Sequence, residues 1–263
     1  MQNDVLLSDA DRMADSKSTA AAVKGPIGRL GGGFMVSREA KDLCARTGLG
    51  PRELYFRGRC GVLGEVDADV VTSVAVFFPP AHVRESWEGG RKLPVEEAVA
   101  LYTEACHAWG RRKLSDAEAC GRLAELLEKV ATAAPVLGAP LFAGWRAVPL
   151  PDEPIARATQ LMHVVRELRG GLHAVAVLAE GLDPLVATLA ADHEGTPLGI
   201  SSGESMARFF TWPEPYPKLD EETIARRRAA EELTDELMAS AFAVLTDAER
   251  DEVVTSMRLG HVH

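Results

Sequence analysis

The feature that most constrains the fold is a long apolar segment with helical periodicity, which runs from Ala156 to Val186. Charged residues and a glycine pair interrupt it at 166–173, which reads Arg-Glu-Leu-Arg-Gly-Gly-Leu-His. Charges inside a buried helix need partners, and adjacent glycines weaken a helix. Because a broken local rule inside a core element is typical of functional sites, this stretch is the first candidate for one.

Helix signals also dominate the rest of the chain. Ser37 and Asp67 fit N-cap positions, and Pro94 fits the first turn of a helix. Two stretches, Ser115–Glu118 and Thr246–Glu249, have the spacing of a capping box. The sequence therefore predicts a mainly α fold with little or no β structure.

A proline- and glycine-rich crossover at residues 135–154 divides the helical pattern. It predicts an N-terminal helical domain over 31–147 and a C-terminal helical domain over 148–263. Residues 1–30 begin with a polar, alanine- and serine-rich stretch, from which we expect a flexible tail.

The charge is distributed unevenly between these parts. Residues 1–147 carry 19 Lys and Arg against 19 Asp and Glu, whereas residues 148–263 carry 10 against 20. The net charge of −10 thus belongs to the C-terminal part, which makes duplex DNA a poor partner for it. We find no apolar run long enough to span a membrane and no apolar signal core at the N-terminus, so we expect a cytoplasmic protein.

The first group of candidate binding residues lies at 55–82. Arg57 and Arg59 could hold a carboxylate or phosphate, or form an ion pair between the two halves, for example with Glu167. Tyr55 could offer its hydroxyl to a pocket or serve as a packing anchor. Phe78 and His82, on either side of a proline pair, could line a ligand pocket or simply close a helix end.

The second group is the interrupted helix itself. His173 could be a general base, a haem ligand or a satisfied core histidine, and Glu167 and Arg169 could tune its pKa. The pair Gly170-Gly171 could break the helix into an anion-binding nest, or let another helix approach closely. A single histidine suffices for an axial haem ligand, so haem stays a candidate cofactor, whereas no metal site is predicted from the spacing of the histidines.

A third group is the proline- and aromatic-rich segment 195–218. It contains Phe210 and Trp212 among several other rings and prolines. So many aromatic side chains in an irregular segment predict a lid over an apolar ligand, a homodimer contact, or a cover for the core.

Several motifs, taken together, resemble an actinobacterial family classed as helix-turn-helix-like, whose members mostly have no assigned activity. The matching stretches include Tyr55-Phe-Arg-Gly-Arg-Cys-Gly-Val-Leu-Gly64 and Leu168-Arg-Gly-Gly-Leu-His173. Between them lie similar stretches at 70–79, 134–140 and 149–154. The resemblance implies two helical halves derived from winged-helix units. The sequence departs from it at 195–218, where a recognition helix and a hairpin wing would stand.

These observations lead to one principal hypothesis and two alternatives. The principal one is a protein that binds an apolar or carboxylate-bearing small molecule between its halves, and one form of it is an enzyme of specialised metabolism with His173 as its catalytic residue. The first alternative is a transcriptional regulator that binds DNA, which rests on the family's fold name alone. The second is a haem protein with a histidine ligand.

Overall fold

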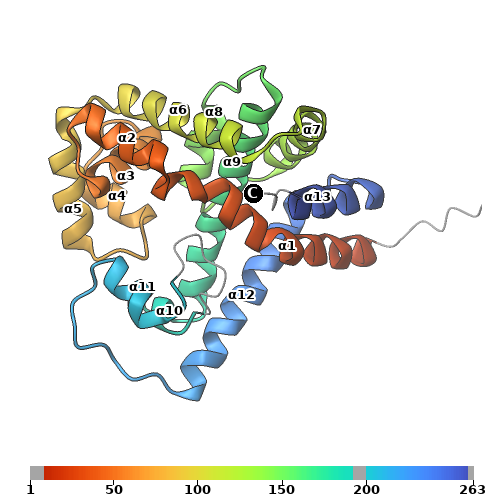
Figure 1. Ribbon diagram of the computed structural model, residues 1–263. Coiled ribbons are helices and arrows are strands. Elements are labelled where there is room, and N and C mark those ends of the chain that lie inside the picture. The colour runs from red at the N-terminus through yellow and green to blue at the C-terminus, as the bar shows by residue number, and fades with distance from the viewer. Residues whose placement is uncertain (1–8, 192–199, 260–263) are drawn as a thin grey trace, which may run out of the picture.

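The computed structural model describes residues 9–191 and 200–259, and within these ranges every regular element is a helix and none is a strand (Figure 1). The mainly α prediction is thus confirmed. Five described helices precede residue 90: α1 (Asp9–Gly32), α2 (Arg38–Thr47), α3 (Pro51–Cys60), α4 (Ala68–Val74) and α5 (Pro80–Gly89). Short 3₁₀ turns connect some of them, at Gly33–Val36, Gly61–Leu63 and Gly90–Lys92.

The remaining helices follow the same local rules. They are α6 (Val95–Lys113), α7 (Ala117–Ala133), α8 (Pro140–Ala147), α9 (Pro154–Ala179), α10 (Pro184–Leu189), α11 (Gly203–Phe209), α12 (Glu221–Phe242) and α13 (Asp247–Leu259). None of the described helices combines the length and apolar character that a membrane span requires.

Capping side chains explain where several helices begin. Ser37 accepts from the backbone N–H of Ala40, and Asp67 accepts from that of Asp69, as the sequence predicts. The Thr246–Glu249 capping box also forms, with Thr246 and Glu249 each bonded to the other's backbone N–H. At α7 the prediction was wrong by one residue, because Asp116 and not Ser115 is the N-cap.

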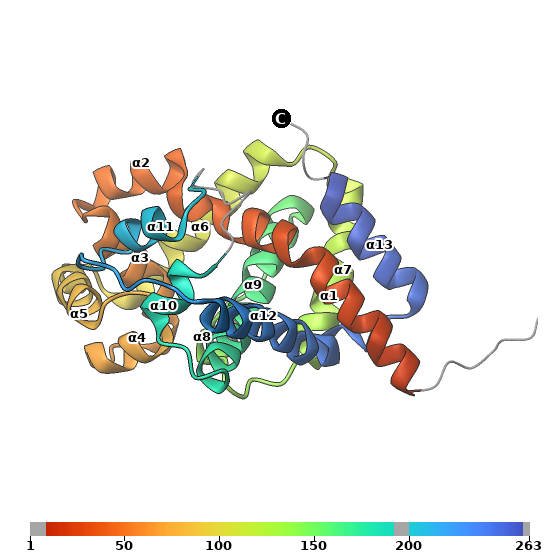
Figure 2. The same ribbon diagram turned by 90° about the horizontal axis from the view of Figure 1, so that it is seen from below.

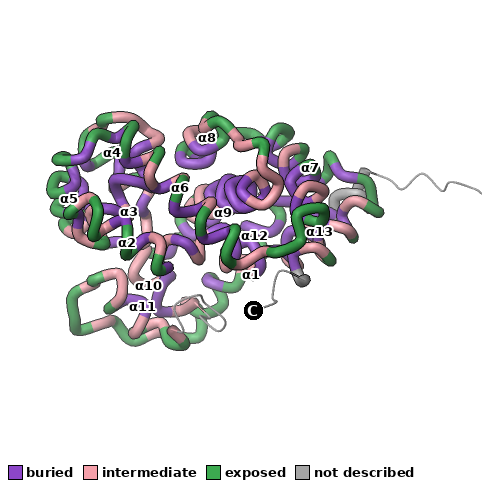
Figure 3. Tube along the Cα trace, turned by 45° about the horizontal axis from the view of Figure 1, so that its top comes forward, coloured by how far each residue is buried: buried purple, intermediate pink, exposed green. Residues whose placement is uncertain are grey.

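Helix α9 is the centre of the molecule, and α1, α6, α7, α8 and α12 pack around it (Figure 1). The view from below shows α1 and α12 side by side across it (Figure 2). Most of α9 is buried along its length, which explains why its sequence is apolar on more than one face (Figure 3). One hydrophobic core cluster joins Phe34 and Phe56 from the first half to Leu168 and Phe242 from the second. The domain boundary near residue 147 stays a prediction.

Helices α2 to α5 form a lobe beside this bundle, attached chiefly through α6 (Figure 1). A separate core cluster holds the outer part of the lobe together, with Leu43, Leu49 and Leu54 packed on Leu93 and Ala98. The placement of the lobe next to α1 and α9 creates the space in which the cavities lie.

Two expectations about irregular segments were wrong. Residues 9–30 belong to helix α1 and are not a flexible tail, because Ala20, Val23, Ile27 and Leu30 form an apolar stripe at spacings of three and four that enters the core. The crossover 135–154 contains a helix, α8, which starts at a proline as helices often do. Residues 1–8 of the expected tail and 195–199 of the aromatic segment lie outside the described residues.

Candidate functional site

A cavity of about 660 Å³ lies between the lobe and the bundle. Its walls come from α1, α2, α3, α6, α9 and α11. Most lining side chains are apolar or aromatic, including Met35, Leu54, Phe78, Met206 and Phe209. We call this space the main chamber. Its volume lies in the range of cavities that hold drug-sized ligands.

A side chamber of about 250 Å³ adjoins the main chamber. The two share the lining residues Gly28, Tyr55, Phe78, Arg166 and Phe210, so we treat them as one cleft with two parts. Gly28 matters to this junction because a Cβ added there would meet no atom within 4 Å. The glycine therefore faces open space where the chambers meet.

The charged residues that line the cleft are all cations. Lys41, Arg52 and Arg166 line the main chamber, and Lys24, Arg59, Arg166 and Arg169 line the side chamber. The described lining of both chambers contains no aspartate or glutamate. In a chain of net charge −10, this local excess of cations makes the wall of the cleft more positive than the protein as a whole.

Glu167 neutralises part of this charge from behind the cleft. It accepts two hydrogen bonds from Arg59, at 2.9 and 2.8 Å, and one from Arg166 at 2.7 Å. Burial alone would raise the pKa of Glu167, but the two guanidiniums outweigh it and lower the pKa to about 2. The predicted ion pair between the halves thus exists for Arg59, and it holds α3 against α9.

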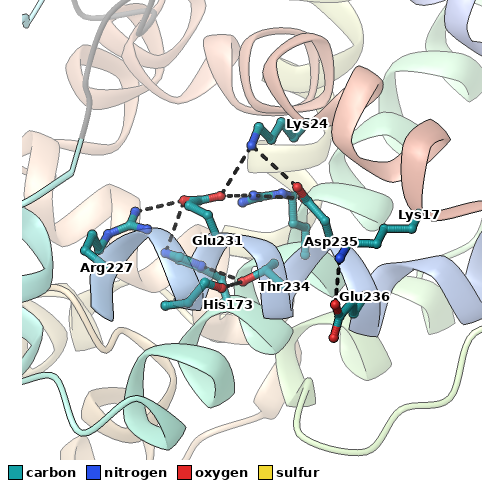
Figure 4. Close-up of polar contacts among 10 residues, drawn as sticks. Lys17, Lys24, His173, Arg227, Glu231, Thr234, Asp235 and Glu236 are labelled. Carbon is teal, nitrogen blue, oxygen red and sulfur yellow. Dashed lines mark hydrogen bonds and ion pairs between the residues drawn. The ribbon is translucent and has the colours of Figure 1, made fainter. Parts of the chain in front are cut away.

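Arg169 and Lys24 belong to a second network, between α9, α1 and α12 (Figure 4). Arg169 donates to Glu231 at 2.6 Å, and Lys24 lies 3.8 Å from Glu231 and 3.5 Å from Asp235. Arg227 donates to the other oxygen of Glu231 at 2.8 Å. Arg169 and Arg227 lower the pKa of Glu231 to about 2 against the effect of its burial.

His173 lies at the end of this network and outside the cavities (Figure 4). Its Nδ1 is 2.8 Å from the Thr234 hydroxyl, which itself donates to the carbonyl of Ala230. Because the hydroxyl hydrogen of Thr234 is already donated to Ala230, its oxygen acts as the acceptor here and the His173 ring donates from Nδ1. Burial lowers the pKa of His173 to about 3. The position fits a satisfied core histidine better than a general base.

The glycine pair allows close packing and does not break the helix. Helix α9 continues through Gly170 and Gly171 to Ala179. A Cβ on Gly171 would meet the backbone of Gly138 and Ala139 at 2.9 and 2.7 Å, so the segment before α8 needs this glycine in order to approach. Of the two interpretations, close approach is the one that the geometry bears out.

The other predicted site residues are divided between the cleft and the core. Tyr55, Phe78 and Phe210 line both chambers, and Glu167 lines a small cavity of about 40 Å³ beside them. Arg57 lies elsewhere in the lobe, where it donates to Glu65 and to the carbonyl of Leu93.

Two further predicted residues lie near the cleft and do not line it. His82 packs on Phe56 and Phe78, and burial lowers its pKa. Trp212 donates to the carbonyl of Phe77 at 2.9 Å and so ties the segment after α11 to the loop after α4.

The cleft also contains two residues that the sequence did not single out, Arg52 and Tyr102, together with Arg166 from the predicted stretch 166–173. Arg52 could have been predicted from the sequence, because residues 52, 55 and 59 fall on one face of a helix. Its guanidinium lies 4.2 Å from the centre of the Phe209 ring and bonds to the carbonyl of the same residue. Tyr102 gives no such signal, since nothing local distinguishes it from a core tyrosine.

Neither haem nor metal binding gains support from this arrangement. None of the described residues that line the three cavities is a histidine, and the described chain holds no cluster of three His, Cys, Asp or Glu that could bind a metal ion. Cys44 lines the main chamber, but burial raises the pKa of its thiol. Cys60 is fully buried, with a pKa raised to about 12.

The fold and the cleft define an all-α protein with an apolar, cation-lined cavity between a helical bundle and a lobe. A profile described as "Helix-turn-helix family" matches residues 20–259, and the chain belongs to that family. Comparison with curated proteins gives no match. Comparison with solved structures gives none either.

Proposed function

We propose that the protein binds an amphipathic small molecule, with a largely apolar body and an anionic group, in the cleft. The observation that carries the proposal is the lining of the main chamber, which combines about 660 Å³ of mainly apolar space with three cations and no described carboxylate. Apolar walls with a few convergent polar groups are the usual composition of ligand sites. Catalysis by His173 is not part of the proposal, because that ring lies outside the cavities.

A substitution that introduces a larger side chain into the wall of the cleft tests the proposal. Gly28→Leu places a side chain in the open space where the chambers meet, without meeting an atom at the Cβ position. We expect it to weaken the binding of the neutral dye Nile red roughly ten-fold or more, while the helix gains stability from the loss of a glycine. Fluorescence titration gives the dissociation constant, and thermal unfolding reports on the fold.

The matched control is Gly121→Leu, which makes the same change on α7 at a partly exposed site. A Cβ there would meet only Pro154, at an ordinary 3.7 Å. Nile red should bind this variant as it binds the unaltered protein. Failure of the unaltered protein to bind the dye, or equal binding to all three proteins, would contradict the proposal.

DNA binding is the second candidate, and the family description is the observation that favours it. Much of the exposed positive charge is already paired, as in Arg111–Glu153, Arg122–Glu252 and Arg226–Glu222. Fluorescence anisotropy with a mixed-sequence duplex tests it. True binding should weaken steeply as salt is raised, because it depends on releasing counterions from phosphates.

A homodimer through 195–218 remains a further prediction, to be checked by light scattering.

A further inference from the structure

Tyr102 is a buried side chain whose polar group has no partner. It lies on α6, is 1% exposed and lines the main chamber. Phe34 packs against its ring at 4.8 Å, and the absence of a Cβ at Gly58 makes room for the ring. Its hydroxyl is buried and makes no hydrogen bond with any described residue. A buried O–H without an acceptor is costly, so such a group in a cavity wall calls for an explanation.

The charges near this hydroxyl indicate where it lies. Burial raises the pKa of Tyr102 well above its ordinary value, while Arg59 and Arg166 act in the opposite direction and Glu167 adds to the rise. The hydroxyl is therefore within electrostatic reach of the ion pair that joins α3 to α9.

Arg166 is the cation best placed to act with Tyr102. It is the one cation among the described lining residues that belongs to both chambers. One of its N–H groups donates to Glu167, and its guanidinium makes no second hydrogen bond with a described residue. The side chain passes close to Gly32, where a Cβ would meet its Nε at 2.7 Å, so the glycine lets it lie along α1.

The local charge also favours an anion here. Glu167 supplies one negative charge, whereas Arg59 and Arg166 supply two positive ones. His163, 3.7 Å from Glu167, is buried and its pKa is lowered to about 4, so it is neutral near pH 7. The cluster therefore keeps one positive charge in excess. Arg52, the other half-buried cation of the main chamber, is already engaged with Phe209.

We propose that Tyr102 and Arg166 together bind the carboxylate of the ligand, with its apolar body lying toward Met35, Met206 and Phe209. The idea rests on the function proposed above and adds the class of ligand and its orientation. A carboxylate offers acceptors for both groups, since it can take the hydroxyl hydrogen on one oxygen and guanidinium N–H groups on the other. A neutral ligand of the same shape would leave the excess charge of Arg166 unpaired in a partly dry site.

The test compares acids with their alcohols. Nile red is first bound to the full-length protein and then displaced by dodecanoate or dodecanol, and by naphthoate or naphthylmethanol. We expect at least one acid to bind about ten-fold or more tightly than its alcohol, because a hydrogen-bonded charge pair is lost with the carboxylate. Tyr102→Phe should remove most of that preference and leave the affinity for the alcohol unchanged.

Two further variants separate binding from folding. Tyr102→Phe should not lower the melting temperature, since the hydroxyl that it removes has no partner in the free protein. Tyr216→Phe removes a hydroxyl that donates to the carbonyl of Trp212, outside both chambers, and should leave the preference for acids intact. Arg166→Gln should abolish the preference while Arg59 still holds Glu167.

The outcomes distinguish this inference from the function on which it rests. If Nile red does not bind to the unaltered protein, the proposed function fails. If the dye binds but acids and alcohols displace it equally, or if Tyr102→Phe retains the full preference for the acid, the cleft remains a binding site and the role of Tyr102 and Arg166 is overturned.

Discussion

Two charged clusters on the same helix, α9, differ in what they contact. Around His173 the contacts tie α9 to α12, because the Thr234 hydroxyl accepts the ring N–H and Arg169 and Arg227 share Glu231 (Figure 4). Around Glu167 the contacts reach the cleft, because Arg59 and Arg166 donate to Glu167 and also line the chambers. Neither cluster is fully satisfied, since Arg169 Nε and Arg227 Nη1 in the first, and the Tyr102 hydroxyl beside the second, make no hydrogen bond with a described residue. One helix can thus carry charges that tie it to a neighbouring helix in one stretch and charges that border a cavity in the next.

Glu167→Gln should give the largest effect of the changes proposed for these clusters. It removes the charge that compensates Arg59, whose side chain is only 10% exposed. Breaking a buried pair from one side costs about 3–5 kcal/mol of unfolding free energy, because a charge stays buried without compensation. Urea unfolding measures the loss.

Glu153→Gln is the control for that experiment. Its partner Arg111 is about half exposed, so water and salt already screen the pair. The expected loss is below about 1 kcal/mol. Equal losses in the two variants would show that the cluster around Glu167 is no more essential to the fold than a surface ion pair.

The cluster around His173 should make stability depend on pH. The pKa of His173 is about 3 in the folded protein, against an ordinary value of 6.5. The unfolded chain therefore binds the proton first as the pH falls, so the stabilisation is complete above about pH 6.5 and declines toward pH 3. Each buried, neutral histidine of this kind should lower the free energy of unfolding by about 2 kcal/mol as the pH falls from about 6.5 to 5.

His173→Asn sharpens the comparison, because the amide can donate to Thr234 as Nδ1 does but cannot take up a proton. Its stability should fall by about 2 kcal/mol less than that of the unaltered protein over the same interval. His163, with a pKa of about 4, and His82 and His107, whose pKa values burial also lowers, titrate in the same direction and contribute to the slope that remains. Identical slopes in the two proteins would contradict the neutral, buried assignment of His173.

The glycine pair offers the smallest and most closely matched test. Gly171→Ala should destabilise the protein by about 1–3 kcal/mol, since its Cβ would press on the backbone before α8. Gly170→Ala should instead stabilise it by about 0.5–1 kcal/mol, because its Cβ meets no atom within 4 Å and an alanine suits a helix better. Thermal unfolding of both variants decides whether adjacent glycines have these opposite roles.

Much of the secondary structure could be predicted from local residues. Ser37, Asp67 and Asp220 each accept from a backbone N–H at a helix start, and this chemistry depends only on neighbours in sequence. The site was predicted less well. His173 and Arg57 attracted attention because charge is unusual in an apolar pattern, yet both are satisfied within the core.

The sequence by itself determined a mainly α chain, the caps that start its helices and the helix that needed partners for its charges. Only the tertiary structure decided which charges pair, since Arg59 and Glu167 are 108 residues apart and meet because the fold brings the end of α3 close to α9. It also decided that Tyr102 lines a cavity and that no described residue accepts from its hydroxyl. Caps are local and can be read in order along the chain, whereas a cavity is what remains after distant helices have packed.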